Sequence, residues 1–485
     1  MDIRHEQLKG LLDALPTAEA VSLARKVETQ RALGLSELPA DAILAALRPQ
    51  LRRVRPARIP TLCRLGCAGF EDFLIDASDE RRLPGLIPRA SIGLWWQALA
   101  RFAPQEIRTY ATELARLAPV NDRTGLDRLG ESLRRSARGW TEAVLAQAES
   151  RKLTDADARK ALADPGVQTD FTEIAHILGI AEPLRQALEA VSAAAARSGN
   201  KEGRRICELA SEAVSEAKLQ YLRFSETHGL DSRYVAIGIL NRLARPWEIL
   251  RLGRALSWKP TDALMRDTEL GIIGQRLIRD LEMQVRAVAE LAPQRRRGSG
   301  AAVDFPRLQQ ALLQYIESVE GMLGEFGFRR DSHWGEQILS TRAILSRALG
   351  PSQLTEVAET ALAVLPLRRG ISTRGLASDD PDLDAIPSAE TVEQALRAAG
   401  FLMLLAQKGE RHGLSSPARA TIEGIGDEID NRTNRLFEEL SARPEHGAAA
   451  SQIAATVRIA ETLFEDDRAQ TLSRRFKNMQ RSAVA

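Results

Sequence analysis

The sequence predicts an all-α protein, a multi-helix bundle or an irregular array of helical hairpins with no significant β-sheet. Ala, Leu, Arg and Glu, which favour helices, dominate the composition, while aromatic residues make up only 5% of it. Apolar residues recur at intervals of three and four over most of the chain, as on the buried face of an amphipathic helix. No alternation of apolar and polar residues is long enough to predict a strand.

The composition is that of an ordinary globular protein. The chain has 485 residues, 44% hydrophobic and 27% charged, which is enough for roughly two to four domains with their own cores. Its formal net charge of +2 is close to balance. The molecule as a whole therefore has no field that favours nucleic acid or a membrane surface.

The first predicted domain, residues 1–120, combines short helices with a region rich in arginine and aromatic residues. Thr17 is placed to cap one helix, and Pro104 is placed in the first turn of another, where its missing N–H is harmless. A Pro/Gly break at 83–88 separates two of the helices. The expected helices span residues 2–14, 17–33, 39–54, 61–75, 89–102 and 104–118.

The second predicted domain, residues 121–292, contains the longest amphipathic patterns. Gly229 is a natural helix C-cap, and Pro246 separates two later helices. The last helix carries a seam with spacing close to a heptad repeat, which suggests coiled-coil-like packing. Its seam residues are Leu270, Ile273, Leu277, Leu281, Val285 and Val288. The expected helices span residues 122–150, 154–163, 169–178, 181–198, 202–228, 231–244, 247–257 and 261–292.

Composition also predicts the organisation of the remainder. Residues 293–304, rich in Arg, Gly and Ser, are expected to be a linker and the best domain boundary. A helical hairpin region follows at 305–365, and a basic and then acidic stretch at 366–388 is expected to be a mobile loop. The C-terminal bundle, 389–485, should contain helices at about 388–411, 416–441 and 448–481.

Sequence motifs for several chemistries are missing. There is no Gly-Lys pair for a phosphate loop, no His-Glu-x-x-His and no Gly-x-Ser-x-Gly. Glu173 and His176 have the spacing of a di-iron ligand pair, but such sites need two such motifs. The sequence therefore predicts no catalytic residues, no cofactor-binding residues and no metal ligands, and it favours a protein that is not an enzyme.

Cysteine usage and hydropathy bear on location. The three cysteines, an odd number in a long chain, argue against a disulfide framework and for a reducing compartment. Cys63 and Cys67 are four residues apart and are expected to be small buried side chains; an oxidised bridge has no support in the sequence. No apolar run is long enough to cross a bilayer, and no signal peptide is evident. We expect a cytoplasmic protein.

Three basic features are candidate partner-binding surfaces. Arginines with aromatic residues can bind a nucleic-acid backbone and stack on bases, although aromatic residues at helical spacing are usually core and arginines usually cover its rim. The C-terminal feature suits a partner groove; we do not expect it to contact a membrane. The candidates are Arg48, Arg52, Arg53, Arg55, Arg58 and Arg64; then Arg242, Arg245, Trp247, Arg251, Arg254 and Trp258; and last Arg474, Arg475, Phe476 and Lys477.

The leading functional hypothesis is a non-catalytic cytoplasmic scaffold or adaptor that binds a protein partner or itself. The alternative is a nucleic-acid-associated protein that uses the patches at 48–64 and 242–259, a partner class that is open but less favoured. The third hypothesis is a helical enzyme whose site converges from distant helices. Asp170, Glu173 and His176 are its candidate residues.

Overall fold

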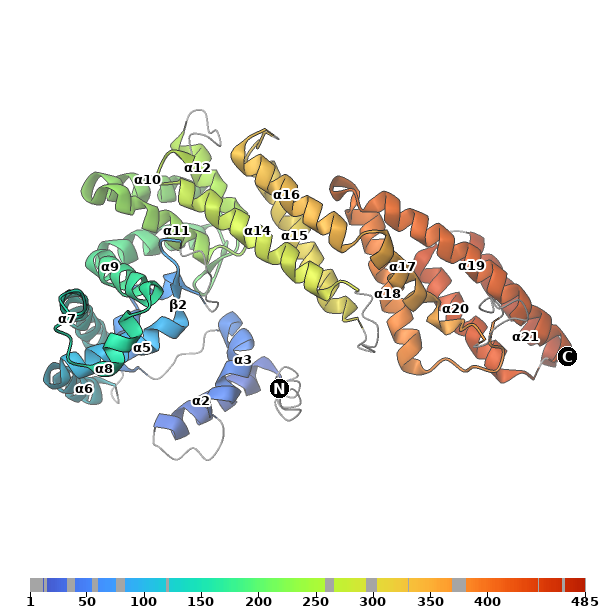
Figure 1. Cartoon of the computed structure of the whole chain (residues 1–485), viewed down its shortest axis with the longest axis horizontal. Coiled ribbons are helices and arrows are strands. Elements are labelled where there is room, and N and C mark those ends of the chain that lie inside the picture. Colours follow the sequence, from blue (N-terminus) through green and yellow to red (C-terminus); the bar gives the residue numbers. More distant parts are fainter. Residues whose placement is uncertain are drawn as a thin grey trace. The chain divides into compact units, whose positions relative to one another are not determined.

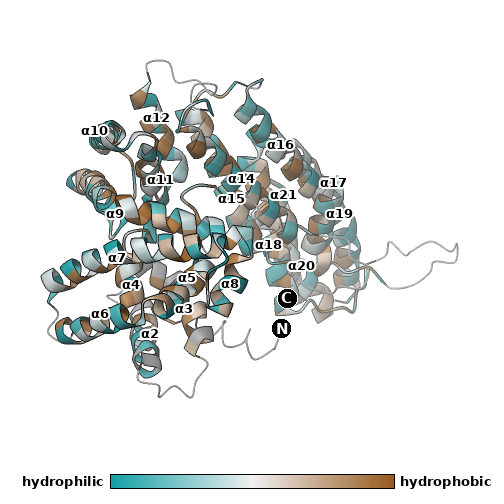
Figure 2. Cartoon of the chain, turned by 60° about the vertical axis from the view of Figure 1, so that its left-hand side comes forward, coloured by the Kyte–Doolittle hydropathy of each residue, from teal (hydrophilic) through white to brown (hydrophobic). Residues whose placement is uncertain are grey.

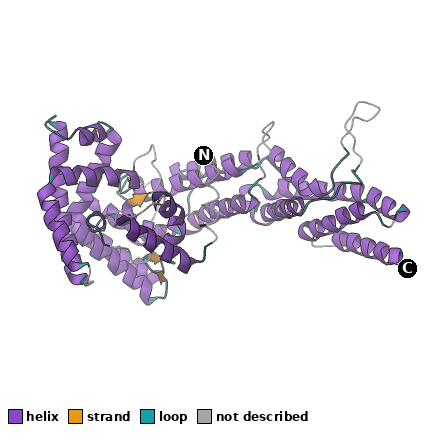
Figure 3. Cartoon of the chain, turned by 90° about the horizontal axis from the view of Figure 1, so that it is seen from below, coloured by secondary structure: helices purple, strands orange, loops and turns teal. Residues whose placement is uncertain are grey.

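A computed structural model of the chain confirms the all-α class. It describes residues 12, 15–32, 40–54, 60–75, 83–118, 122–257, 266–293, 303–329, 331–368, 381–443, 445–464 and 467–484 (Figure 1). Within these residues, the strands form two sheets of two short strands each, and helices account for nearly all the remaining regular structure (Figure 3).

The chain divides into two compact units, which we call unit 1 and unit 2. Unit 1 comprises Met1–Pro260 and Met265–Ile273, and unit 2 comprises Thr261–Leu264 and Gly274–Ala485. The linker expected at 293–304 therefore falls in the sequence of unit 2, and its residues 294–302 lie outside the described residues, as do 369–380 of the expected loop. The helix expected at 2–14 also lies almost wholly outside them.

Unit 1 is organised around two long helices, α7 and α9. Helix α7 packs against α4, α5, α6 and α9, and α9 packs in turn against α10 and α11. Its helices are α2 (Thr17–Ala32), α3 (Ala40–Val54), α4 (Leu62–Cys67), α5 (Arg89–Phe102), α6 (Pro104–Leu117), α7 (Arg123–Glu149), α8 (Ala156–Leu162), α9 (Pro165–Arg197), α10 (Ser211–His228), α11 (Ser232–Arg242) and α12 (Leu250–Leu256), with short 3-10 turns η1 (Glu71–Phe73), η2 (Gly229–Asp231) and η3 (Pro246–Ile249).

Aromatic residues from the N-terminal third form part of the core of unit 1. Trp95 on α5 is fully buried, and its Nε1 donates to Thr141 Oγ1 on α7 at 2.9 Å. Phe70 meets the Trp95 ring edge-on, with 5.5 Å between ring centroids. These contacts place the turn after α4 close to α7, and residues of both segments line one cavity.

Two sheets of two-residue strands are present, in keeping with the expected lack of a significant β-sheet. Strand β1 (Leu74–Ile75) pairs in parallel with β2 (Ile87–Pro88), and β3 (Lys201–Glu202) pairs antiparallel with β4 (Arg205–Ile206). The helix expected from residue 202 is therefore wrong at its start, because α10 begins at Ser211. Gly203, with φ of 60°, occupies the two-residue turn between β3 and β4, a position that suits glycine.

Helix α9 also corrects the expectation. The two helices expected at 169–178 and 181–198 are one continuous helix that includes Pro183. A proline inside a helix removes one backbone hydrogen bond. Apolar residues buried on both sides of it, such as Ile177 and Leu188, offset that loss.

Unit 2 is arranged around α18, whose Phe401 and Leu402 are fully buried. Helix α18 packs against α15, α17, α19 and α20, and α20 packs against α21. Figure 2 shows hydrophobic residues concentrated along one side of many of the helices. The described helices are α14 (Gly271–Leu291), which belongs to unit 2 from Gly274 onward, α15 (Phe305–Glu325), α16 (His333–Ala348), α17 (Pro351–Ala361), α18 (Ala389–Lys408), α19 (Ser415–Ala442), α20 (Gly447–Leu463) and α21 (Asp467–Val484), with 3-10 turns η4 (Leu362–Val364) and η5 (Glu410–His412).

Two helix boundaries in this part of the chain were predicted wrongly. Helix α14 begins at Gly271 rather than 261, and residues 267–270 form turns and a bend. The predicted seam residues are confirmed as buried, from Leu270 in the turn before α14 to Val288 on the helix. The helix expected at 448–481 is two helices, because the backbone at Phe464 is extended (φ −121°, ψ 117°) and ends α20.

Gly274 on α14 faces the indole ring of Trp334, a fully buried residue on α16. A Cβ at this position would lie 1.9 Å from Trp334 Cζ2, far inside van der Waals contact. We expect Gly274→Ala to destabilise unit 2 by about 2 kcal/mol or more, because a rigid ring in a packed core cannot move aside cheaply. Urea denaturation monitored by hydrogen exchange of unit 2 peptides measures this effect.

Gly324 on α15 provides a matched control. It is exposed, and an added Cβ would meet no atom within 4 Å. Gly324→Ala should stabilise the same unit by up to about 1 kcal/mol, because alanine favours a helix more than glycine does. A Gly274→Ala variant as stable as Gly324→Ala would show that the helix contact is not as described.

Candidate functional site: a charged cavity in unit 1

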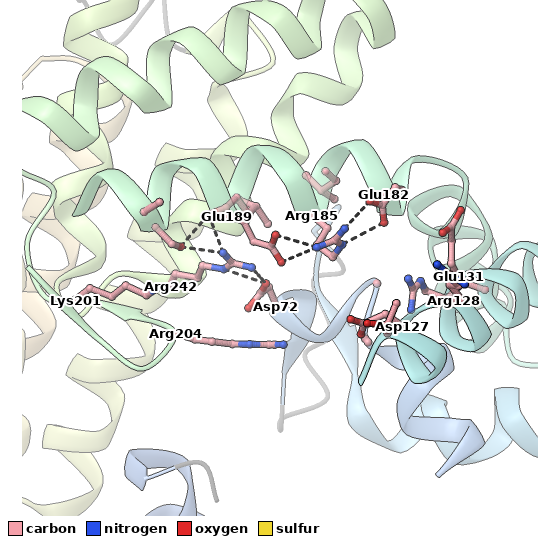
Figure 4. A pocket seen from close by; sticks show the side chains of 18 residues that line it. Asp72, Asp127, Arg128, Glu131, Glu182, Arg185, Glu189, Lys201, Arg204 and Arg242 are labelled. Atoms are coloured by element: carbon pink, nitrogen blue, oxygen red, sulfur yellow. Dashed lines mark hydrogen bonds and ion pairs between the residues drawn. The ribbon is translucent and has the colours of Figure 1, made fainter. Parts of the chain in front are cut away.

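The principal candidate site is a cavity of about 680 Å³ in unit 1, which we call the charged cavity (Figure 4). Its walls come from the turn after α4, η1, α7, α9, the β3–β4 hairpin and the end of α11. Eleven lining residues are charged, and both signs are represented. They are Asp72, Asp127, Arg128, Glu131, Arg134, Glu182, Arg185, Glu189, Lys201, Arg204 and Arg242.

Helical periodicity places most of these side chains. On α9, Glu182, Arg185 and Glu189 are spaced three and four residues apart and share one face with Ser192. Asp127, Glu131 and Arg134 repeat the same spacing on α7. Because α7 packs along α9, these two charged faces line one space.

The ion pair of Arg242 with Asp72 anchors the interior of the charged cavity. The two side chains are only 9% and 13% exposed, and Arg242 Nη2 lies 2.6 Å from Asp72 Oδ2. Arg242 Nη1 also donates to the Leu188 carbonyl at 2.9 Å and to Ser192 Oγ at 3.0 Å. The guanidinium is therefore held by groups from η1 and α9 at once, which keeps it in one orientation.

A second ion-pair network lies along α9. Arg185 donates to Glu182 Oε1 at 2.5 Å and to Glu189 Oε1 at 2.8 Å. The hydrogen bond to Glu182 raises the pKa of Arg185 above its usual value, and the same bond lowers the pKa of Glu182. The three side chains therefore hold one another in place before any ligand binds.

Arg134 is held more deeply than the other arginines of α7. Burial is the main cause that lowers its pKa, and its Nη1 donates to the Leu65 carbonyl at 3.2 Å. Gly69 provides the room, because a Cβ there would lie 2.9 Å from both Arg134 Cδ and Ala181 Cβ. A larger residue at position 69 would push this arginine out of its place.

Three charged side chains of the cavity are available to a ligand. Asp127, Arg128 and Lys201 form neither an ion pair nor a hydrogen bond with the described residues, and all three are exposed. Figure 4 shows Arg128 and Asp127 on one side of the cavity and Lys201 on the opposite side. The cavity thus offers positive charge at two separated points and negative charge at one of them.

The arginines predicted as a binding patch at 242–259 are mostly engaged in the protein's own contacts. Arg242 lines the charged cavity, whereas Arg245 Nη2 lies 2.6 Å from the buried Glu248 and Arg251 pairs with the same carboxylate at 3.8 Å. The guanidinium of Arg245 also lies 5.4 Å from the centre of the Trp247 ring. Arg254 is exposed on α12, and Trp258 lies outside the described residues.

Of the arginine patch predicted at 48–64, the structure describes the side chains of only two arginines. Arg48 is exposed on α3, and Arg64 on α4 forms an ion pair of 2.8 Å with Glu28 on α2. Nothing is described of the side chains of Arg52 and Arg53. Arg55 and Arg58 lie outside the described residues.

The C-terminal candidates lie on α21. Arg475 packs over the Phe437 ring of α19, 4.1 Å from its centre, and donates to Asn434 Oδ1 at 2.7 Å. Arg474 reaches Gln470 on its own helix at 3.4 Å, Phe476 is half-buried, and Lys477 is exposed. Helix α21 thus already uses part of this feature to pack against α19.

The three residues proposed for a helical enzyme face different partners. Asp170 is buried and accepts a hydrogen bond from Ser91 Oγ. Glu173 Oε1 accepts from Gly85 N at 2.5 Å and from Tyr234 Oη at 2.8 Å. His176 Nε2 lies 2.8 Å from Asp231 Oδ1. These bonds tie α9 to the 83–91 segment and to the start of α11.

The charged cavity was not predicted from the sequence, except for Arg242. Its charges appear in the sequence as the solvated faces of two amphipathic helices. The signal that could have found them is the pair of charged faces at three- and four-residue spacing on α7 and α9. Recognising it requires knowing that these helices are neighbours.

Among the described residues, no group of three or more histidine, cysteine, aspartate or glutamate side chains is placed to hold a metal ion. The described helices also include none with the length and hydropathy needed to cross a membrane. No family model matches the chain, and neither a curated protein nor a solved structure matches it.

Proposed function

We propose that this protein is a non-catalytic adaptor of the cytoplasm that binds a charged segment of a partner protein in the charged cavity of unit 1. The observation that carries the proposal is the wall of that cavity, where charges of both signs are ordered by their own ion pairs while Asp127, Arg128 and Lys201 remain available. The partner is expected to be another protein or a second copy of this chain.

The balance of charges favours a protein segment over a polyanion. Arg128 and Lys201 would bind carboxylates, whereas Asp127, the acid of the cavity that has no ion pair among the described residues, would repel the continuous negative charge of a nucleic-acid backbone beside Arg128. A peptide loop or helix end with both acidic and basic residues can match both signs. Such complementarity supplies specificity and orientation for an adaptor more than it supplies raw affinity.

Preformed ion pairs further support a binding role. Arg242 and Arg185 are held in place by the carboxylates around them, so a partner would not have to order these side chains on binding. Ordering long side chains at an interface costs about 0.5–1.5 kcal/mol for each one. A cavity that is already ordered avoids part of that cost.

A charge reversal at the two available cations tests the proposal. We expect the double variant Arg128→Glu with Lys201→Glu to reduce partner capture about tenfold or more, since two attractive contacts become repulsive. The tagged chain is used to isolate partners from its native host, with half of each sample treated with nuclease. Quantitative mass spectrometry compares the variant with the wild-type chain.

The matched control is the double variant Arg159→Glu with Lys160→Glu. Both residues are exposed on α8, outside the charged cavity, and the change in net charge is the same. This control should capture the partner as the wild type does. Equal capture by the cavity variant would overturn the proposal, and loss of all partners after nuclease treatment would instead favour the nucleic-acid hypothesis.

A further inference from the structure

Cys63 and Cys67 lie at the edge of a second cavity of unit 1, one that the proposed function does not use. Their Sγ atoms are 3.9 Å apart, on successive turns of α4. The cavity has a volume of about 360 Å³, and its apolar lining includes Pro60, Leu65, Leu74 and Ile92. Its polar lining includes the arginines Arg64 and Arg89 and the carboxylate of Glu71.

We infer that Cys63 and Cys67 are a reversible dithiol site, which closes to a disulfide by exchange with a low-molecular-weight disulfide of the glutathione type. Helix geometry places the two Cα atoms about 6.2 Å apart, within the range of about 4.4–6.8 Å that disulfides span. Rotation of the side chains about χ1, with a small movement of the last turn, would bring the sulfurs together. Cys67 is the last residue of α4, where a helix yields most easily.

The surroundings assign a different role to each thiol. Cys63 is only partly buried, whereas Cys67 is buried. The hydrogen bond from Cys67 lowers the pKa of Cys63; burial opposes this effect, and the charge of Arg64 lowers the pKa further. The same hydrogen bond and burial raise the pKa of Cys67. Cys63 is therefore the attacking thiolate, and Cys67 is the resolving thiol.

The exchange has two steps. The Cys63 thiolate attacks one sulfur of the small disulfide, forms a mixed disulfide and releases one small thiolate. Cys67 then gives up its proton to solvent, and its thiolate attacks Cys63 Sγ and releases the second small thiolate. The protein dithiol loses two electrons, and the small disulfide gains them as it becomes two thiols.

The sequence around the pair makes the bond directly detectable. Arg64 lies between the two cysteines, so trypsin places Cys63 in the peptide 59–64 and Cys67 in the peptide 65–81. The folded chain is incubated with oxidised glutathione, its remaining thiols are alkylated, and it is digested without reduction. We expect the two peptides to appear as one linked species that dithiothreitol separates.

Cys207 serves as the internal control. It is half-exposed and has no described cysteine beside it, so it should be alkylated or carry one glutathione, and Cys63 should react about tenfold faster than Cys207. Cys67→Ser should stop the reaction at a mixed disulfide on Cys63, and Cys63→Ser should leave Cys67 unmodified. Circular dichroism of both variants checks that they fold.

Two results would overturn the inference. One is alkylation of both Cys63 and Cys67 in the folded chain after prolonged oxidation. The other is a mixed disulfide on Cys63 that persists in the wild-type chain although Cys67 is intact. Neither outcome depends on partner binding. The experiment therefore tests the dithiol site separately from the proposed adaptor function.

Discussion

Acidification from about pH 7.5 to about pH 4.5 should destabilise unit 2 by about 2.5 kcal/mol through His412 alone. This residue is 3% exposed at the turn between α18 and α19, and neither of its ring nitrogens has a hydrogen-bond partner among the described residues. Burial, together with the nearby charges of Arg342 and Arg411, lowers the pKa of His412 to about 4.

The direction of the effect follows from proton linkage. The unfolded chain binds a proton at this histidine below the ordinary pKa of 6.5, whereas the folded chain stays neutral there until the pH approaches 4. Between these values the proton favours the unfolded state by up to about 1.4 kcal/mol for each pH unit. Above about pH 7 the histidine contributes no pH dependence.

His412→Leu isolates this contribution. Leucine is similar in size and has no titrating group, so the difference in stability between wild type and variant should change by about 2.5 kcal/mol across that pH range. Urea denaturation followed by hydrogen exchange of α18 and α19 peptides measures unit 2 separately from unit 1. A difference that stays constant with pH would mean that His412 is not buried in its neutral form.

Removal of the Glu248 carboxylate should destabilise unit 1 by about 2–3 kcal/mol. Glu248 is fully buried, accepts from Leu209 N at 2.7 Å and neutralises both Arg245 and Arg251. Glu248→Ala would leave a buried N–H and two arginines without this acceptor, which is far more costly than loss of a surface pair. The cost is moderated because both arginines are partly exposed.

Glu208 supplies the matched comparison for this change. It pairs with the same Arg251 at 3.5 Å but is 45% exposed, so Glu208→Ala should cost less than about 0.5 kcal/mol. Glu248→Gln, which retains an acceptor for Leu209 N, should fall between the two. Hydrogen exchange of peptides from α10 and α12 during urea denaturation provides the measurement. Equal losses for Glu248→Ala and Glu208→Ala would contradict the described burial.

Local sequence signals predicted most of the helices. The amphipathic helix expected at 122–150, which is α7, and the seam on α14 depend on neighbouring turns of one helix, so the apolar spacing is enough to predict them. Capping residues work at the same range, as where Asp122 accepts from Gly125 N at the start of α7. The errors occur where burial or pairing outweighs local helix signals, as at Pro183 inside α9 and at Ile206, which pairs with Lys201 in the β3–β4 hairpin and also with Leu243 of a later segment.

The candidate site shows the same limit more clearly. Arg242 was predicted to be part of a cationic surface. In the structure it forms an ion pair with Asp72, which lies 170 residues away in the chain and neutralises its charge. The sequence identifies both residues as charged and cannot say that they are partners. For the same reason, Cys63 and Cys67 could be placed on one helix face, whereas the cavity beside them depends on Leu74 and Ile92 from other segments.

The sequence by itself determined the all-α class, most helix positions and the missing motifs, because hydrophobic periodicity, capping and turn propensities act within a few residues. Only the tertiary structure decided which charges remain available to a partner. Electrostatic pairing depends on distance in space, and α7, α9, η1 and α11 meet only after the chain has folded. Asp127, Arg128 and Lys201 are therefore distinguished from the many other charged residues by the fold and not by their sequence.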